Sequence, residues 1–544
     1  MGTRAWGAVI ALSLVAATPA HAAMPTLEHQ GTAARLVVDG RPLLVLGGEL
    51  GNSSPSSRAY MAKYWPKLKA MNLNTVLSPV SWELIEPKEG VFDFSSIDGL
   101  LADARAQDMH LVLLWFGTWK NSMSTYVPGW VKRDQARFPR ARAANGTSVE
   151  ILSAFSPNVR DADAKAYAAL LAHLKAVDGR GTVLMVQVEN EIGMLPTARD
   201  WGDDATAAWG RPVPDALLRC LAGDGAQPEL KALWQAHGAR TNGTWAQVFG
   251  DADGGQEVFT AWFYAQYTEA VTRAGKAAYP LPMYANVALN RTGKAPGEYP
   301  AGGPLPHLID VWKAGAPSLD LISPDIYFPN FSDLAGRYRR ADNPLFIPEA
   351  NNVTTAAEVP ANGFYAIGNL DAFGYSPFSI ENADGKYQAA LTEAYGVLRQ
   401  LTPAILKAQG LDRMAGFKPR VLEDGTVLEA PVSRTIGDYR FTVAFIDPWL
   451  PKADQDVSAH GGMIIQTGPE EYLIAGRGLV VTFAGAGEGP ALAGIDRAEE
   501  GDFNAQGQWV GGRVLNGDQT HQGRHIRLGS EKFQIQRVTF YRYR

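Results

Sequence analysis

Residues 182–191 read Thr-Val-Leu-Met-Val-Gln-Val-Glu-Asn-Glu, an apolar run that ends in a cluster of polar side chains. An apolar run of this length is typical of a strand that is buried on both faces of a parallel sheet. Alternate residues of a strand share a face, so Gln187, Glu189 and Glu191 are expected on one face together with Met185. An unpaired buried charge is costly, so this end of the strand predicts a ligand site. The alternative is a satisfied carboxylate network that only closes the sheet.

The segments around this strand alternate between helix and strand patterns. The segment before it predicts a helix, because apolar residues recur at helical spacing from Tyr167 to Val177. The expected strands are residues 43–48, 73–80, 109–116, 182–188, 281–287, 319–327, 344–349 and 373–380. Strands that alternate with helices in this way predict a (β/α)8 TIM barrel of the α/β class, with its active site at the carboxyl ends of the strands.

Further segments flank this pattern. A hairpin over residues 35–42 is expected to turn at Asp39-Gly40, and Ser95 or Ser96 is expected to cap a helix. Residues 60–71 and a last segment with apolar residues from Leu391 to Ile405 also predict helices. An insertion over residues 196–255 carries Trp201, Trp209, Trp234 and Trp245 and is expected to roof the site. Past residue 410, short strands between Gly, Asp and Asn turns predict a smaller β-sandwich-like domain. The expected domains are residues 23–410 and 411–544.

The first residues predict an export signal. Arg4, an apolar stretch over residues 5–17 and the sequence Ala20-His21-Ala22 fit a signal peptide that is removed after residue 22. A membrane anchor is the rival interpretation, but the run is shorter than the roughly 20 apolar residues that a span needs. We therefore expect a secreted, periplasmic protein without a membrane anchor.

Composition excludes several classes of partner and site. The formal net charge is −6 and no basic stripe is present, which disfavours binding to nucleic acid. Cys220 is the one cysteine in the sequence, so neither an internal disulfide nor a cysteine-rich zinc site is expected. Residues 251–254 predict a turn rather than a calcium loop, and His521 and His525 lie in a predicted loop, so no metal and no cofactor are expected. Composition leaves the oligomeric state open.

A second carboxylate follows the seventh expected strand. Leu345, Ile347 and Glu349 alternate along it, and Glu349 stands where the apolar run stops. Glu191 and Glu349 are therefore expected at the same rim of the barrel. Glycoside hydrolysis needs such a pair, in which one group donates a proton to the leaving oxygen and the other attacks the anomeric carbon or activates water.

Several motifs resemble glycoside hydrolase family 35, a family of retaining β-galactosidases. They are residues 186–191, Trp82 with Glu86-Pro87 and residues 90–94, residues 344–349, and Gly47-Gly48-Glu49. The resemblance covers roughly residues 35–410, and residues 82–90 also resemble family 42. It implies that Glu191 is the acid/base, Glu349 the nucleophile and Asn190 the ligand of the sugar 2-hydroxyl. It also implies that Tyr327 holds the nucleophile, while Glu49, Glu189 and Asn286 are further candidates for binding the sugar.

Other positions depart from the family pattern. Thr118 stands where the family usually has a sugar-binding Glu, Pro79 stands in place of a sugar-contacting Tyr, and Ile192 follows the acid/base in place of Tyr. Trp115 and Trp119, at or beyond the end of the third strand, are candidates for stacking on a sugar or for packing.

The expected function is retaining release of terminal β-galactosyl residues from oligosaccharides or polysaccharide side chains. The alternatives are another β-glycosidase, an endo-β-glycanase of the same superfamily, or an inactive carbohydrate-binding protein. The β-rich tail either binds glycan or serves as a structural cover for the barrel.

Overall fold

The computed structural model describes residues 22–223, 225–351 and 356–544. The expected signal peptide, residues 1–22, therefore lies almost wholly outside the described residues. Among the helices of the described ranges, none combines the length and the apolar character that crossing a membrane requires.

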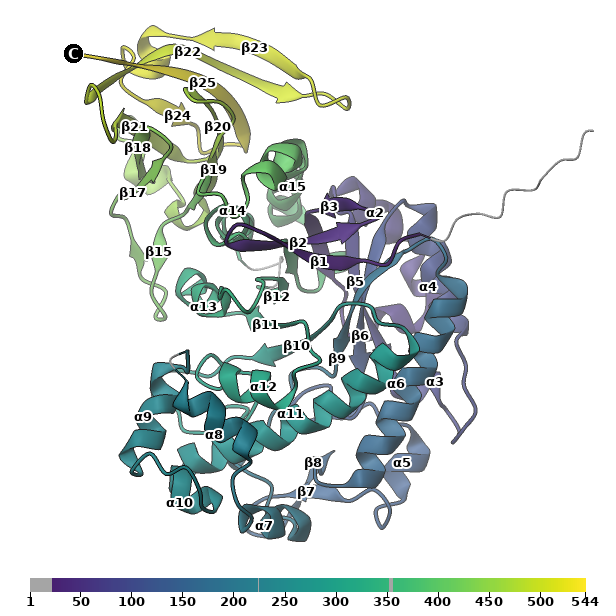
Figure 1. The fold of residues 1–544 in the computed structure, drawn as a ribbon. Helices are drawn as coiled ribbons and strands as arrows, with labels where there is room; N and C mark the ends of the chain where they lie inside the picture. Colours follow the sequence, from purple (N-terminus) through teal and green to yellow (C-terminus); the bar gives the residue numbers. More distant parts are fainter. Residues whose placement is uncertain (1–21, 224, 352–355) are drawn as a thin grey trace, which may run out of the picture.

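Eight parallel strands form a closed barrel in chain order, as predicted (Figure 1). They are β4 (Val45–Glu49), β5 (Thr75–Ser81), β6 (His110–Phe116), β9 (Val183–Val188), β10 (Met283–Ala288), β11 (Leu321–Ile326), β12 (Ile347–Ala350) and β13 (Gly374–Pro377). Closure comes from β13, which pairs with β4. The fold prediction is confirmed: a TIM barrel brings the carboxyl ends of all these strands to one rim.

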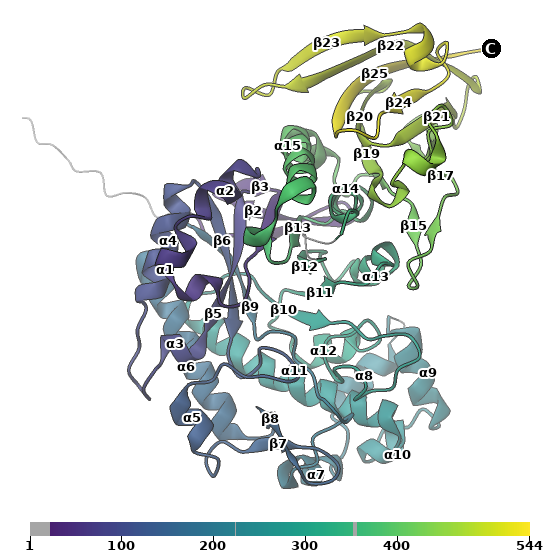
Figure 2. The ribbon, with the colours of Figure 1, turned by 180° about the vertical axis from the view of Figure 1, so that it is seen from behind.

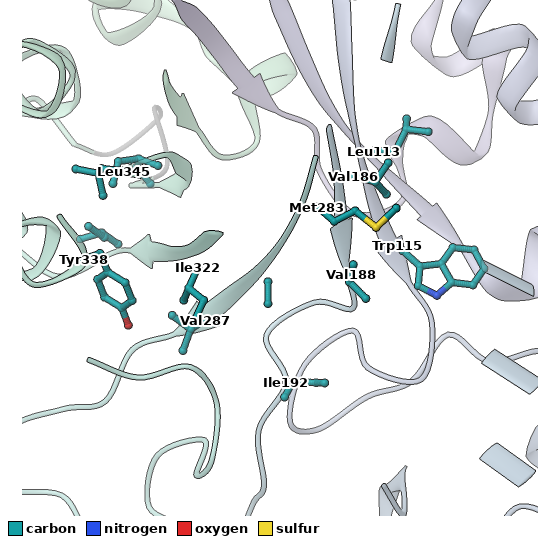
Figure 3. Packing of buried hydrophobic residues seen from close by; sticks show 14 of the residues in the cluster. Leu113, Trp115, Val186, Val188, Ile192, Met283, Val287, Ile322, Tyr338 and Leu345 are labelled. Atoms are coloured by element: carbon teal, nitrogen blue, oxygen red, sulfur yellow. The ribbon is translucent and has the colours of Figure 1, made fainter. Parts of the chain in front are cut away.

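The barrel strands have two apolar faces. Leu77, Val112 and Phe346 belong to one buried cluster, the barrel interior, while neighbouring residues of the same strands join a larger cluster with the surrounding helices. Figure 3 shows part of this outer cluster, including Leu113 and Trp115 on β6. Burial on both faces explains why the strands are apolar throughout.

A small antiparallel sheet precedes the barrel. It contains β1 (Thr26–Gln30), β2 (Ala33–Val38) and β3 (Arg41–Leu43). The predicted turn is present, with left-handed φ values of 50° at Asp39 and 72° at Gly40. β1 was not expected, because its sequence, Thr-Leu-Glu-His-Gln, is largely polar. Leu36 of β2 belongs to the interior cluster of the barrel, so this sheet covers the amino end of the strands.

Helices surround the barrel strands. They are α1 (Arg58–Met61), α2 (Trp65–Ala70), α3 (Trp82–Ile85), α4 (Ser95–Ala106), α5 (Gly129–Arg133), α6 (Pro157–Val177), α11 (Asp253–Ala278), α12 (Ile309–Gly315), α13 (Phe331–Tyr338), α14 (Val359–Leu370) and α15 (Gly385–Ala408). The helix expected over residues 60–71 is divided into α1 and α2. The expected cap is also wrong: Phe94 is the N-cap residue of α4, and the N–H of Ser95 donates to Asp93 at 2.9 Å. A two-stranded ribbon, β7 (Arg140–Arg142) and β8 (Ser148–Leu152), precedes α6.

The tryptophan-rich insertion forms a helical layer against α11. It contains α7 (Asp203–Trp209), α8 (Asp215–Ala222), α9 (Pro228–Ala236) and α10 (Trp245–Phe249), at the end of the molecule far from the C-terminal sheets in both ribbon views (Figures 1 and 2). Trp209 and Trp245 both pack edge-to-face on Phe259 of α11, at 5.1 and 5.2 Å between ring centroids. Trp234 donates its indole N–H to the carbonyl of Arg240. These tryptophans pack within the insertion and against α11, and the expectation that the insertion roofs the site stays a prediction.

The C-terminal part consists of two antiparallel sheets. One contains β14 (Met414–Phe417), β19 (Gly461–Gln466), β20 (Glu471–Arg477), β25 (Gln534–Tyr543), β22 (Leu492–Phe503) and β23 (Trp509–Leu515). The other contains β17 (Val432–Ile436), β18 (Tyr439–Ala444), β21 (Leu479–Gly485) and β24 (Ile526–Leu528), with a ribbon of β15 (Arg420–Val421) and β16 (Val427–Leu428) beside them. Residues of both sheets share one buried cluster, so the β-sandwich-like prediction is confirmed.

The two parts meet through α14. This helix packs against β14 and β19, and Phe364 of α14 stacks on Phe533 with 5.2 Å between ring centroids. Figure 2 shows α14 and α15 between the barrel strands and the C-terminal sheets. The boundary expected at residue 410 stays a prediction; it falls between the end of α15 at Ala408 and the start of β14 at Met414.

Candidate active site

The first candidate carboxylate, Glu191, lies in a tight turn after β9. The strand ends at Val188, and both Glu189 (φ 62°) and Glu191 (φ 43°) adopt left-handed backbone conformations. Such conformations are strained for residues other than glycine, and hydrogen bonds hold this one. The N–H of Glu191 donates to Asn286 Oδ1 at 2.9 Å. The turn breaks the strand alternation, so the expectation that Gln187, Glu189 and Glu191 share one face is wrong.

The second candidate, Glu349, is directed inward by an irregular strand. Phe346 belongs to the barrel interior, whereas Leu345 and Ile347 belong to the outer cluster. The pairing of β12 with β13 shifts register between Ile347 and Ala350, which turns Glu349 toward the interior. The expectation that Leu345, Ile347 and Glu349 share a face is therefore wrong, although Glu349 reaches the expected rim. The Tyr327 hydroxyl donates to Glu349 Oε1, as the family resemblance implied.

Glu191 and Glu349 converge at the rim of the barrel. One carboxylate oxygen from each of Glu191, Asp325 and Glu349 lies within 4.8 Å of the other two. Asp325, at the end of β11, is 2% exposed and accepts a hydrogen bond from Asn286 Nδ2 at 2.7 Å. Glu49, at the end of β4, is also 2% exposed and interacts with Glu349. Four acids from four strands thus share this end of the barrel.

Burial and mutual repulsion favour the protonated forms of acids in this cluster. Burial, followed by the charge of Glu349, raises the pKa of Glu191 to about 7, although Lys120 opposes this shift. Burial and the neighbouring carboxylates raise the pKa values of Glu49 and Asp325 well above their usual range. Near neutral pH, Glu191 therefore exchanges a proton readily, which is the property that a general acid/base needs.

Lys120 supplies the positive charge beside these acids. Its Nζ lies 3.8 Å from Glu191 Oε2, and its side chain is 12% exposed. Burial lowers the pKa of Lys120, but the carboxylates, Glu191 first, outweigh this effect and raise it. Sequence reasoning missed both Lys120 and Asp325. Asp325 could have been found from its place in Ser323-Pro324-Asp325, at the end of a barrel strand. For Lys120 the sequence offers no signal beyond its position one residue after Trp119.

Asn190 and Asn286 form hydrogen bonds with residues of the site. Asn190 Oδ1 accepts hydrogen bonds from Gln187 Nε2 at 2.7 Å and from Asn286 Nδ2 at 3.0 Å. The Nδ2 of Asn190 donates to the carbonyl of Lys120 at 2.7 Å, and the residue is fully buried. Both asparagines thus lie at the predicted place, and their contact with a sugar stays a prediction.

Three other candidates lie outside the barrel interior. Trp115 and Trp119 are both 0% exposed. The Trp115 indole donates to Asp163 Oδ1 on α6, as its outward direction in Figure 3 suggests, and Trp119 packs edge-to-face on Tyr267 of α11. Glu189 accepts a hydrogen bond from the Trp119 N–H and is 1% exposed. Because their rings are fully covered, neither tryptophan presents a stacking face, and the sugar-binding role expected for Glu189 is not supported by its position.

Thr118 does not face the carboxylates either. It is buried, and its hydroxyl lies 2.8 Å from the Tyr267 hydroxyl on α11. The Trp82–Glu86 motif closes a loop: the Trp82 indole donates to Glu86 Oε2 and the Gly90 N–H donates to Glu86 Oε1. Tyr327, beside the nucleophile candidate, is 41% exposed.

Comparisons with known proteins find matches to parts of this chain. Residues 35–212 match the family model described as Glycosyl hydrolases family 35, and residues 391–527 match a model described as a domain of unknown function, DUF5597. A β-galactosidase from Xanthomonas manihotis is 33% identical over 229 residues, which make up 40% of this chain and 34% of that protein. The chain thus spans about a third of the length of that relative. The resemblance to family 35 is confirmed over these residues.

Solved structures of β-galactosidases are also similar. The enzyme from the psychrophilic Marinomonas ef1 has a TM-score of 0.46 at 14% identity, over 66% of this chain and 60% of that chain. The enzyme from Rahnella sp. R3 has a TM-score of 0.46 at 16% identity, over 70% of this chain and 59% of that chain.

Proposed function

We propose that this chain, whose residues 35–212 match glycosyl hydrolases family 35, is a retaining β-galactosidase that releases terminal β-galactosyl residues. The observation that carries the proposal is the approach of Glu191 and Glu349 within 4.8 Å. Retaining glycosidases hold their two carboxyl groups about 5 Å apart, whereas inverting enzymes need a separation of about 6.5–9.5 Å to admit a water molecule.

In the first step, Glu349 attacks the anomeric carbon while the protonated Glu191 donates to the leaving oxygen. The hydrogen bond from the Tyr327 hydroxyl orients Glu349 and suits a carboxylate acceptor. This step forms a glycosyl ester on Glu349 and releases the aglycone.

In the second step, Glu191, now ionised, takes a proton from water as the water attacks the anomeric carbon. The sugar leaves with its original anomeric configuration, and both carboxyl groups return to their starting states. Lys120 lies beside Glu191 throughout and stabilises the ionised form that the first step produces.

The choice of β-galactosides rests on the family match and on the Xanthomonas manihotis relative. Action at chain ends, on oligosaccharides or polysaccharide side chains, and export to the periplasm are part of the same proposal. The proposal assigns no step to a cofactor.

A panel of aryl β-glycosides tests the substrate class. We expect turnover of the β-galactoside, with the β-anomer of galactose as the first product by NMR. Strong hydrolysis of a β-glucoside with none of the β-galactoside would refute the galactosidase assignment. Release of the α-anomer first would refute retention.

A further inference from the structure

One buried acid near the site takes no part in the reaction described above. Glu189 is the first residue after β9, next to Asn190 and Glu191, but its side chain faces Asp163 of α6 and is 1% exposed. There it meets Asp163 of α6, which is 0% exposed. Two carboxyl groups in contact inside a protein cannot both be ionised at low cost, so one of them is expected to keep a proton.

Asp163 is surrounded by donors. Its Oδ1 accepts from the Trp115 indole at 2.8 Å, and its Oδ2 accepts from the Thr118 N–H at 3.1 Å and from the Tyr267 hydroxyl at 2.9 Å. Donors on both oxygens favour the ionised form of a carboxyl group. Asp163 is therefore the member of the pair that carries the negative charge.

Glu189 has a different environment. Its Oε2 accepts from the Trp119 N–H at 2.8 Å, while its Oε1 is buried and has no donor among the described residues. A Cβ atom on Gly117 would lie 2.8 Å from Glu189 Oε1 and 2.8 Å from Asp163 Oδ1, so both oxygens border the same small space. A proton on Oε1 converts this unsatisfied acceptor into a donor toward Asp163.

The remaining titratable groups around Glu189 are consistent with this state. Tyr167 of α6 and Tyr267 of α11 face the pair, and burial raises the pKa of each well above its usual value. Both phenols are therefore neutral. Burial, followed by the charge of Asp163, also raises the pKa of Glu189 well above its usual range.

We propose that Glu189 is a neutral carboxylic acid that donates to Asp163 and thereby positions the turn that carries Glu191. The proposal rests on the proposed function, because the turn matters only if Glu191 reacts. Glu189 is a positioning residue: it acts through the backbone and through neighbouring side chains.

The turn and the loop after β6 are joined at several points. Glu189 accepts from the Trp119 N–H, the Asn190 N–H donates to the Trp119 carbonyl at 3.2 Å, and Asn190 Nδ2 donates to the Lys120 carbonyl at 2.7 Å. Lys120 then brings its ammonium group to 3.8 Å from Glu191. The Glu189–Asp163 hydrogen bond connects the turn and the loop after β6 to α6. Loss of this bond is therefore expected to loosen the Lys120–Glu191 pair.

Three variants test the proposal by their kinetics. Glu189→Gln keeps a donor for Asp163 and an acceptor for Trp119, so we expect kcat and the pH profile to stay within about threefold of the wild type. Glu189→Ala should lower kcat by about tenfold or more with a smaller change in KM, and should move the upper limb of the pH profile to higher pH. Glu191→Gln is the matched comparison, since the same exchange two residues away removes the acid itself.

An equal loss in Glu189→Gln and Glu189→Ala would overturn the proposal, because it would mean that the charge of Glu189 is needed. Infrared spectroscopy gives an answer that does not depend on activity or on the alanine variant. The Glu189→Gln protein should lack one carboxylic acid C=O band of the wild type at pH 8, and an unchanged band pattern would refute a neutral Glu189. If the wild type hydrolysed no β-glycoside, the proposed function would fail, while the infrared result would still decide the protonation state.

Discussion

Glu191 and Glu349 bring carboxylate oxygens within 4.8 Å of each other, although β10 and β11 separate their strands in the barrel. Neither residue reaches this position by regular strand geometry. Glu191 follows a turn with left-handed residues, and Glu349 follows a register shift. The local irregularity of both strand ends therefore produces the pair on which the proposed chemistry depends.

The role of Glu191 predicts a dependence on the leaving group. In Glu191→Gln, hydrolysis of an alkyl β-galactoside should fall by several orders of magnitude, because its leaving oxygen needs a proton. A dinitrophenyl β-galactoside leaves without protonation, so its first step should survive and produce a burst of dinitrophenol in stopped-flow measurements. The partly exposed Glu83, exchanged to Gln, serves as the control and should retain wild-type rates. Equal losses for both substrates in Glu191→Gln would contradict the acid/base role.

The pKa of Glu191 predicts the pH profile. The first step needs the protonated form, so kcat/KM should fall as pH rises through about 7. Lys120 lowers this pKa, and Lys120→Met should therefore move the falling limb to higher pH. Lys132→Met, which removes a partly exposed lysine paired with Glu83, should leave the limb in place. A limb that stays fixed in Lys120→Met would show that another group controls it.

The hydrogen bond from Tyr327 predicts a specific loss. Tyr327→Phe keeps the ring but removes the donor to Glu349, and a hydrogen bond to a charged group contributes roughly 1.5–3 kcal/mol. We expect kcat to fall by roughly 10- to 150-fold, with the melting temperature nearly unchanged because the side chain is 41% exposed. Steady-state kinetics and calorimetry measure the two effects. An unchanged kcat would mean that the hydroxyl does not act on the nucleophile.

The barrel fold could be predicted because the same helix–strand pattern recurs along the sequence. Each of the eight strands is an apolar run between helical stripes, and the structure closes all of them into one barrel. Local signals were less reliable. Ser95 has the chemistry of a helix cap, but Asp93 receives its N–H and Phe94 occupies the cap position. The sequence does not show whether the four tryptophans of the insertion pack in a core or stack on a sugar, because large aromatic rings suit both roles.

The meeting of Glu191 and Glu349 at the barrel rim was also predictable, whereas the surroundings of the two carboxylates were not. Alternation along a strand holds only while the strand lasts, and it fails at Glu189, where φ turns positive, and before Glu349, where the register shifts. Lys120 lies in a loop, and no periodic pattern places a loop residue beside an acid on another strand. Trp119 shows the same limit: its position after a strand predicts the rim of the barrel, but its ring is fully buried against α11.

The contact between the barrel and the C-terminal sheets predicts a stability effect. Phe533 is 5% exposed and stacks on Phe364 of α14. Phe533→Ala should lower the free energy of unfolding by about 3–5 kcal/mol, because truncating a buried Phe leaves a cavity. Denaturant unfolding monitored by fluorescence measures this loss. Val510→Ala on the exposed part of β23 is the control and should change little. A loss below about 1 kcal/mol in Phe533→Ala would show that the two parts are energetically independent.

The most direct test of the double-displacement mechanism is the mass of a trapped intermediate. A 2-deoxy-2-fluoro-β-galactosyl fluoride reacts by the first step but slows the second, so incubation followed by peptide mass spectrometry locates the attached sugar. We predict one fluorogalactosyl group on the peptide that contains Glu349, and none on the Glu349→Gln variant. Attachment to any other residue would contradict the assignment of the nucleophile, and turnover of a β-galactoside without any attached sugar would contradict the double-displacement mechanism.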